Sequence, residues 1–209
     1  GGPNAPLVYY KGFTRDFIAG NQGTSADWIE QIAAAVDDMA KTKSFVLVDG
    51  VGFPGVGSCV GVSNAEVAKA SRAPTVLVGK SGVGSAIDSY CLNATFFLSA
   101  GVPVLGGIFN FGALDGFYRY DIIEEQIVSF MGQQRSREHV YGVLPDNEYL
   151  KDVREKISEM TPERLLELAE INISHVVQFM DVASLILHAS LDPWNRDALP
   201  LAALLGAAG

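Results

Sequence analysis

Residues Thr75–Asp88 read TVLVGKSGVGSAID and lead an apolar run into a glycine-rich turn and then into the start of a helix. Strand, glycine-rich turn and helix are the layout of a phosphate-binding loop. That loop requires the pattern G-x-x-x-x-G-K-[ST], and Pro74 stands where its first glycine would have to be. The stretch therefore predicts a strand, a turn and a helix without a phosphate-binding loop, and the pattern occurs nowhere else in the 209 residues.

Apolar runs alternate with helix-like segments on both sides of this stretch. Short continuous apolar runs, typical of strands buried in a parallel sheet, fall at 45–48, 74–79, 102–110 and 140–145. Apolar periodicity and capping residues predict helices at 27–39, with Ser25 as its cap, at 64–71, opened by Ser63, and at 87–100 and 122–131. We therefore predict an α/β fold with a three-layer parallel sheet, whose functional residues gather at the carboxyl ends of the strands.

The composition excludes several classes of function. There are 24 acidic and 15 basic residues, a net charge of −9, so a nucleic-acid partner is not expected. No stretch approaches the roughly 18 continuous apolar residues of a membrane span. Cys59 and Cys91 predict reduced thiols in an intracellular protein, and the start at Gly1-Gly2 leaves a mitochondrion or plastid open.

The last third of the chain changes to helical character. Thr161 can cap a helix and Pro162 suits its first turn, and the apolar residues that follow predict one helix through Leu165–Leu187. This helix is apolar around much of its circumference, which suits either a core helix or docking onto another subunit. We predict two parts, an α/β domain at 1–150 and a helical extension with an uncharged tail at 151–209.

The segment from Leu47 to Asn110, LVDGVGFPGVGS through VLGGIFN, together with KGFTRDFIAG at 11–20, carries a resemblance to a known family. It resembles the second half of a dethiobiotin-synthetase-like P-loop ATPase domain, of the type attached to some phosphotransacetylases. The similarity covers residues 11 to about 145. It implies a P-loop-type parallel sheet that is truncated, because the half of the family's domain that carries the P-loop is not matched.

The resemblance also implies roles for individual residues. Asp49 would match the strand-end acid that helps hold Mg²⁺ near the γ-phosphate, and Gly50 and Gly52 would match the glycines after it. Asn110 would match the asparagine that reads the adenine edge, and Pro145 would lie in the loop that closes over the base. From the residues alone, Asp49 as a turn-capping acid and Asn110 as an ordinary turn residue remain equally open.

Two departures from the family weaken the nucleotide prediction. The P-loop, a catalytic lysine and a second metal-binding acid lie upstream of the GFTRD segment in the family, and only eleven residues precede that segment here. Phe111 follows Asn110 where the family commonly has lysine. Gly82 would belong to a glycine-rich turn that shapes the site without cradling phosphates.

Two hypotheses follow from these features. The first is a degenerate, non-catalytic subunit that assembles with other protein subunits in a hetero- or homo-oligomer. The alternative is one half of a Mg-ATP-dependent enzyme whose P-loop comes from an upstream segment or a separate chain. Asp49, Asn110 and Gly82 are expected in one cleft in either case.

Overall fold

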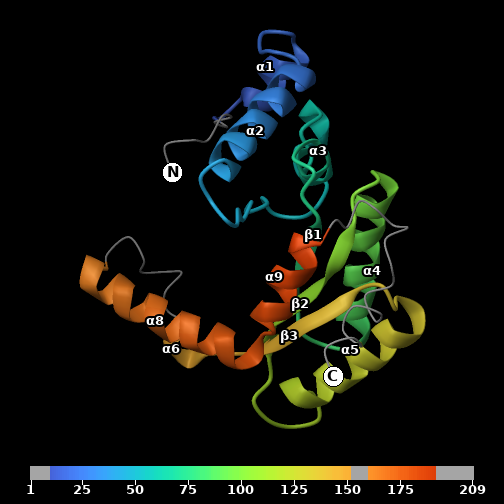
Figure 1. Ribbon diagram of the computed structural model, residues 1–209, viewed down its shortest axis with the longest axis vertical. Coiled ribbons are helices and arrows are strands. Elements are labelled where there is room, and N and C mark those ends of the chain that lie inside the picture. Colours follow the sequence, from blue (N-terminus) through green and yellow to red (C-terminus); the bar gives the residue numbers. More distant parts are fainter. Residues whose placement is uncertain (1–9, 152–159, 192–209) are drawn as a thin grey trace. The chain divides into compact units, whose positions relative to one another are not determined.

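The computed structural model describes residues 10–151 and 160–191 (Figure 1). By the contacts within the chain it divides into two compact units, Gly1–Thr75 with Asn93–Pro103, and Val76–Leu92 with Val104–Gly209. The predicted boundary at residue 150 stays a prediction. The elements of the first unit are α1 Phe13–Ile18, α2 Ser25–Ala40, the short helix η1 Ser58–Val60, and α3 Asn64–Ala70.

A capping box begins α2. The Thr24 hydroxyl accepts from the Asp27 amide at 3.2 Å, and the Asp27 carboxylate accepts from the Thr24 amide at 2.8 Å. The expectation that Ser25 caps this helix is therefore wrong. The Ser25 hydroxyl instead donates to the carbonyl of Val60 at 2.9 Å, which ties α2 to η1. Ser63 caps α3, as the sequence predicted.

A small aromatic and aliphatic core holds the first unit together. Phe13, Val60 and Val62 are buried at its centre, and three larger side chains pack around them: Phe17, Trp28 and Ile29. Phe13 meets Trp28 at a ring-centroid distance of 6.3 Å. The GFTRD segment therefore contributes its phenylalanine to packing.

The expectation of a strand at 45–48 is wrong. The structure has neither helix nor strand there, and the side chain of Leu47 is 82% exposed. A strand exists only where its backbone exchanges hydrogen bonds with a neighbour. Among the described residues this run has no such neighbour, so its apolar character does not translate into a buried strand.

The second unit is built on a three-stranded parallel sheet in the order β1-β2-β3. Its elements are β1 Thr75–Lys80, the first part of α4 Gly84–Ser99, β2 Val104–Gly112, α5 Tyr120–Gln134, β3 His139–Pro145, α6 Glu148–Lys151, α8 Pro162–Phe179 and α9 Val182–Ser190. Thr75 and the residues of α4 from Asn93 onward are grouped with the first unit. Strands and helices alternate from β1 to β3, so α4 and α5 make two successive crossovers in the same direction and cover the same face. The α/β prediction with a parallel sheet and C-terminal helices is confirmed.

A bulge in β3 defines the other face of the sheet. Gly107 pairs with Val140 but Ile108 pairs with Gly142, so Tyr141 is an extra residue in the strand. Such a bulge turns two consecutive residues toward the same side. Tyr141 there contacts α9, and a Cβ on Gly142 would collide with the backbone carbonyl of Phe179 at the end of α8. Helices α8 and α9 thus form the third layer (Figure 1).

The expectation of one continuous helix at Leu165–Leu187 is wrong. Helix α8 starts at the Thr161 cap as predicted, but the chain turns after Phe179 and α9 runs at 79° to α8. Met180 has extended backbone angles, and the carboxylate of Asp181 accepts from the Ser184 amide at 2.9 Å, which starts a new helix. The local cap overrides the apolar periodicity that runs through both segments.

In the described part of the chain no single helix has the length and apolar character needed to cross a membrane. Only the bent pair α8 and α9 passes that test by length and composition when the two are counted together.

Candidate functional site

A pocket of about 560 Å³ lies at the carboxyl edge of the sheet in the second unit. Each of the three strands contributes a residue near its end, such as Val78 of β1, Asn110 of β2 and Pro145 of β3, and α8 closes one side. The carboxyl edge is where ligands bind in open parallel sheets, because the strand ends and the loops after them converge there. Its apolar walls are Val78, Ile108, Phe111, Leu144, Val176 and Met180.

The polar lining consists mostly of amides. Asn110, Asn147 and Asn172 reach the pocket from β2, the turn after β3 and α8, and each side-chain amide offers both donors and an acceptor. The Oδ1 of Asn147 already accepts from the Tyr149 amide at 3.0 Å, and the Oδ1 of Asn110 accepts from the Phe111 amide at 3.2 Å. Nε2 of His175 lies 2.9 Å from the carbonyl oxygen of Pro145, and because a carbonyl only accepts, this nitrogen carries the proton. The pocket is therefore suited to a neutral ligand with donors and acceptors on its edge.

Phe111 adopts an unusual backbone conformation at the rim of the pocket. Its φ of 65° is in the left-handed region, which costs a non-glycine residue about 1 kcal/mol or more. Two hydrogen bonds from the turn after β1 fix this end of β2. The Ser81 amide donates to the Asn110 carbonyl at 2.6 Å, and the Ser81 hydroxyl donates to the Phe111 carbonyl at 2.8 Å. Strain retained in this way is typical of functional sites.

The structure brings two of the predicted site residues together. Asn110 and Pro145 end neighbouring strands and line the same pocket. Gly82 follows Ser81 in the turn, with a φ of 126° that favours glycine, so it supports the rim without lining the pocket. The turn after β1 is thus tied to the end of β2 through Ser81.

Asp49, Gly50 and Gly52 belong to the first unit. Asp49 is exposed and does not end a strand, contrary to expectation. Asn64 of α3 holds the segment after it: its Nδ2 donates to the carbonyls of Val51 and Phe53 at 2.9 Å each, and its Oδ1 accepts from the Val51 amide at 3.2 Å. That Asp49 and Asn110 share one cleft stays a prediction.

Sequence reasoning missed a histidine and tyrosine cluster between β3 and α9. The Tyr141 hydroxyl lies 2.9 Å from Nδ1 of the buried His188, and the rings of His139 and His188 are 4.1 Å apart. Burial lowers the pKa of His139, and burial followed by the nearby His139 lowers that of His188. Alternation along β3 placed His139 and Tyr141 on one face, but nothing local pointed to His188, which is 47 residues away from Tyr141.

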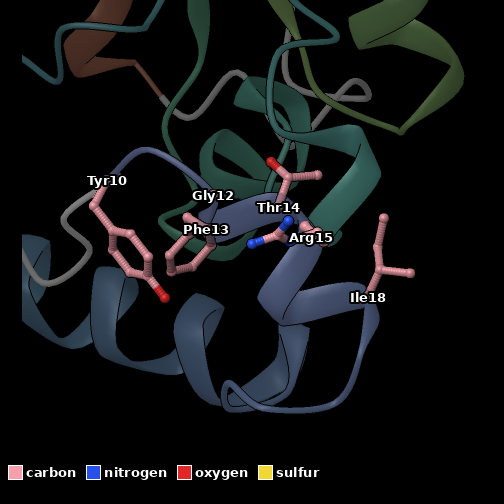
Figure 2. Close-up of a pocket in the computed structure, with 6 residues that line it drawn as sticks. All are labelled: Tyr10, Gly12, Phe13, Thr14, Arg15 and Ile18. Atoms are coloured by element: carbon pink, nitrogen blue, oxygen red, sulfur yellow. The ribbon is translucent and has the colours of Figure 1, made fainter.

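A second hollow of about 460 Å³ lies in the first unit. Figure 2 shows the rings of Tyr10 and Phe13 beside each other and Ile18 at the opposite end. The Tyr10 hydroxyl donates to the Asp16 carboxylate at 2.9 Å and accepts from Gln22 at 2.8 Å, and the bond to Asp16 raises the pKa of Tyr10. Thr14 and Arg15 also line this hollow (Figure 2). The pocket at the sheet edge is treated as the candidate site because it contains Asn110 and Pro145, which the sequence pointed to.

Within residues 10–151 and 160–191, no group of three or more His, Cys, Asp or Glu side chains is placed to hold a metal ion. The comparisons with known proteins give one family. A family model described as an AAA domain matches residues 3–166. No curated protein and no solved structure matches the chain significantly.

Proposed function

Because the chain belongs to the AAA domain family, we propose that the pocket at the carboxyl edge of the sheet binds the base of an adenine nucleotide. In this proposal the chain provides base recognition, and phosphate recognition comes from residues outside these 209. The family model supports a nucleotide-binding domain of P-loop type. We infer the identity of the base, the residues that recognise it, and the separation of base recognition from phosphate recognition.

The observation that carries the proposal is the position of Asn110. This asparagine and Pro145 line one pocket from neighbouring strand ends, as the resemblance to ATPase domains implied. A side-chain amide can donate one hydrogen bond and accept another, which matches the amino group and ring nitrogen on the edge of adenine. The apolar walls formed by Ile108 and Val176 suit the two faces of a flat base.

The chain by itself is then non-catalytic. Hydrolysis of ATP depends on a phosphate-binding loop with its lysine and on a metal, and these 209 residues contain no G-x-x-x-x-G-K-[ST] pattern. Asp49 is exposed and has the chemistry for one Mg²⁺ ligand. Mg²⁺ is commonly bound through one or two carboxylates with phosphates and waters in its other positions. In the alternative function, Asp49 would serve a Mg-ATP site completed by an upstream segment or a partner chain.

A specific feature of α8 favours a second role in assembly with another protein subunit. Leu166, Ile173 and Val177 lie on one face of this helix and are each more than 60% exposed. An apolar stripe with this spacing is typical of helix–helix contacts. Ile173→Glu should lower the mass of any assembly by sedimentation equilibrium, whereas Leu92→Glu, at an exposed leucine on α4, should not.

Titration of the chain with adenosine and with ATP tests the base-binding proposal. We expect shifts of the side-chain amide NMR signals of Asn110 and Asn172, and no release of phosphate from ATP. Asn110→Ala removes the hydrogen bonds to the base edge, which are worth about 1–3 kcal/mol, and should weaken binding by about fivefold to 150-fold.

Asn21→Ala is the matched control, because Asn21 is an exposed asparagine in the first unit. It should leave the affinity unchanged. The proposal fails if millimolar adenosine and ATP both leave the signals of Asn110 and Asn172 in place. Phosphate release that survives purification would instead contradict the non-catalytic part.

A further inference from the structure

The hollow of about 460 Å³ in the first unit contains two polar side chains that are available to a ligand, those of Thr14 and Arg15. Among residues 10–151 and 160–191, no carboxylate pairs with the guanidinium of Arg15, and no hydrogen bond engages the hydroxyl of Thr14. A guanidinium has five N–H donors and no acceptor, and a hydroxyl adds one more donor. The hollow therefore offers hydrogen-bond donors and a positive charge, which suit an anionic group.

Apolar surface lies on both sides of these two polar groups. In Figure 2, Thr14 and Arg15 lie between the rings of Tyr10 and Phe13 and the side chain of Ile18. Ile18 is 72% exposed and Tyr10 is 49% exposed, so both have apolar surface that a ligand would remove from water. Phe13 is buried in the core of the unit, which holds this wall in place. A ligand that fits the hollow therefore has an apolar body as well as an anionic group.

The charges at the hollow suit a ligand with a single negative charge. Of the described residues that line it, only Arg15 is a lysine or arginine. The carboxylate of Asp16 accepts from the hydroxyl of Tyr10 at 2.9 Å, so a negative charge lies beside this wall. A second negative charge on the ligand would meet no further cation and would be repelled by Asp16. A carboxylate has one charge, and its two oxygens match the fork of guanidinium N–H groups, so it fits better than a phosphate.

We propose that this hollow binds a small organic monocarboxylate with an apolar body. Arg15 and Thr14 hold the carboxylate, and the body lies against Tyr10 and Ile18. The inference goes beyond the proposed binding of an adenine base and does not depend on it, because it uses other residues in the other unit. Hydrogen bonds from a guanidinium to a carboxylate are about twice as strong as those between neutral groups. The carboxylate therefore supplies the directional contacts, and the apolar walls select the body.

Calorimetric titrations of the full chain with four probes test the inference: 4-phenylbutanoate, 4-phenylbutanamide, acetate and 3-phenylpropyl phosphate. We expect 4-phenylbutanoate to bind at least tenfold tighter than the amide, which has no charge, and than acetate, which has no apolar body. The phosphate, with its second charge, should bind at least threefold more weakly than 4-phenylbutanoate. Equal binding of acid and amide, or tighter binding of the phosphate, would overturn the inference. So would the absence of binding heat from millimolar 4-phenylbutanoate.

Variants of the full chain assign the binding to this hollow. Arg15→Gln should weaken 4-phenylbutanoate binding at least tenfold, whereas Arg137→Gln, at an exposed arginine of the second unit, should change it less than twofold. Ile18→Ser should weaken binding at least threefold, because it removes part of the apolar wall. In the unaltered chain the NMR signal of the Arg15 Nε–H group should shift as 4-phenylbutanoate is added. Equal effects of the two arginine variants would contradict the assignment. If Arg15→Gln does not fold, an Arg15 Nε–H signal that stays in place contradicts it.

Discussion

The hydroxyl of Tyr141 on β3 lies 2.9 Å from Nδ1 of His188 on α9, and both side chains are buried. Tyr141 lies at the bulge in β3, between the paired residues Val140 and Gly142. The ring of His139, on the same strand as Tyr141, lies 4.1 Å from the ring of His188 and is tilted by 34° to it. Burial and the nearby His139 lower the pKa of His188, and the carboxylate of Asp181, the cap of α9, acts in the opposite direction and raises it.

The histidine pair should make stability depend on pH. Burial lowers the pKa of both His139 and His188 in the folded chain below the ordinary value of 6.5. The unfolded chain therefore binds more protons, so stability is fully present above about pH 6.5 and is lost as pH falls through the lowered values. We expect the midpoint temperature of thermal unfolding to decrease when the pH is lowered from 7.5 to 5. His139→Leu/His188→Leu should flatten this slope, and an unchanged slope would refute the assignment.

Removing the hydroxyl of Tyr141, the hydrogen-bond partner of His188, should lower the stability of the fold. Stability should still decrease as the pH is lowered. Tyr141→Phe deletes one buried hydrogen bond and leaves Nδ1 of His188 without it, which should lower the free energy of unfolding by about 1–2 kcal/mol at pH 7.5. Urea unfolding followed by circular dichroism measures the change. A variant as stable as the parent would show that the 2.9 Å contact contributes nothing.

Gly142 should tolerate no side chain. A Cβ at this position would collide with the carbonyl oxygen of Phe179, and backbone cannot move aside as a flexible side chain can. Gly142→Ala should therefore destabilise the fold by more than about 2 kcal/mol. Gly132 in α5 is the matched control, because nothing lies within 4 Å of its added Cβ. Gly132→Ala should be neutral or stabilise by about 0.5 kcal/mol in the same denaturation experiment, since alanine favours a helix.

Two ion pairs, each between residues three positions apart in the sequence, should contribute differently to stability. Glu138 accepts from Arg135 at 2.6 and 2.8 Å and from the Tyr90 hydroxyl at 2.6 Å, with its side chain only 10% exposed. Burial first, and then the bond to Glu138, raise the pKa of Tyr90. Glu138→Ala strands two donors and should cost about 2–3 kcal/mol.

Glu167 pairs with Arg164 at 2.6 Å but is 59% exposed. Because solvent screens an exposed pair, Glu167→Ala should change the free energy of unfolding by no more than about 0.5 kcal/mol. Similar losses for Glu138→Ala and Glu167→Ala in urea denaturation would contradict the argument from burial.

Asn64 should order the segment that follows Asp49. Asn64→Ala removes all three hydrogen bonds to Val51 and Phe53, so the Val51 amide should exchange its hydrogen at least fivefold faster. Asn64→Asp keeps an acceptor for this amide and should retain most of the protection. The Val56 amide, which is bonded to the Phe53 carbonyl at 3.0 Å, is the internal reference. If the Val51 amide exchanges at the same rate in the parent and in Asn64→Ala, Asn64 does not order this segment.

The sequence by itself determined the features that depend on neighbouring residues. Alternating apolar runs and helical periods predicted β1 through β3 and the α/β class, and Ser63 and Thr161 were correctly read as caps. The predictions of strands and caps succeed because strand pleat, helix period and capping are local. The resemblance to ATPase domains assigned Asn110 and Pro145 to one adenine site. Both residues line one pocket, and what they bind stays a prediction.

Only the tertiary structure decided the features that depend on a distant partner. The apolar run at 45–48 looks like a buried strand, but burial and pairing require a neighbour that local sequence does not specify. His188 meets Tyr141 because the chain turns between α8 and α9 and α9 then packs against β3. The amides of Asn147 and Asn172 also join the pocket through tertiary packing. Contacts across many residues are chosen by packing and hydrogen-bond satisfaction over the whole unit, and no local pattern encodes them.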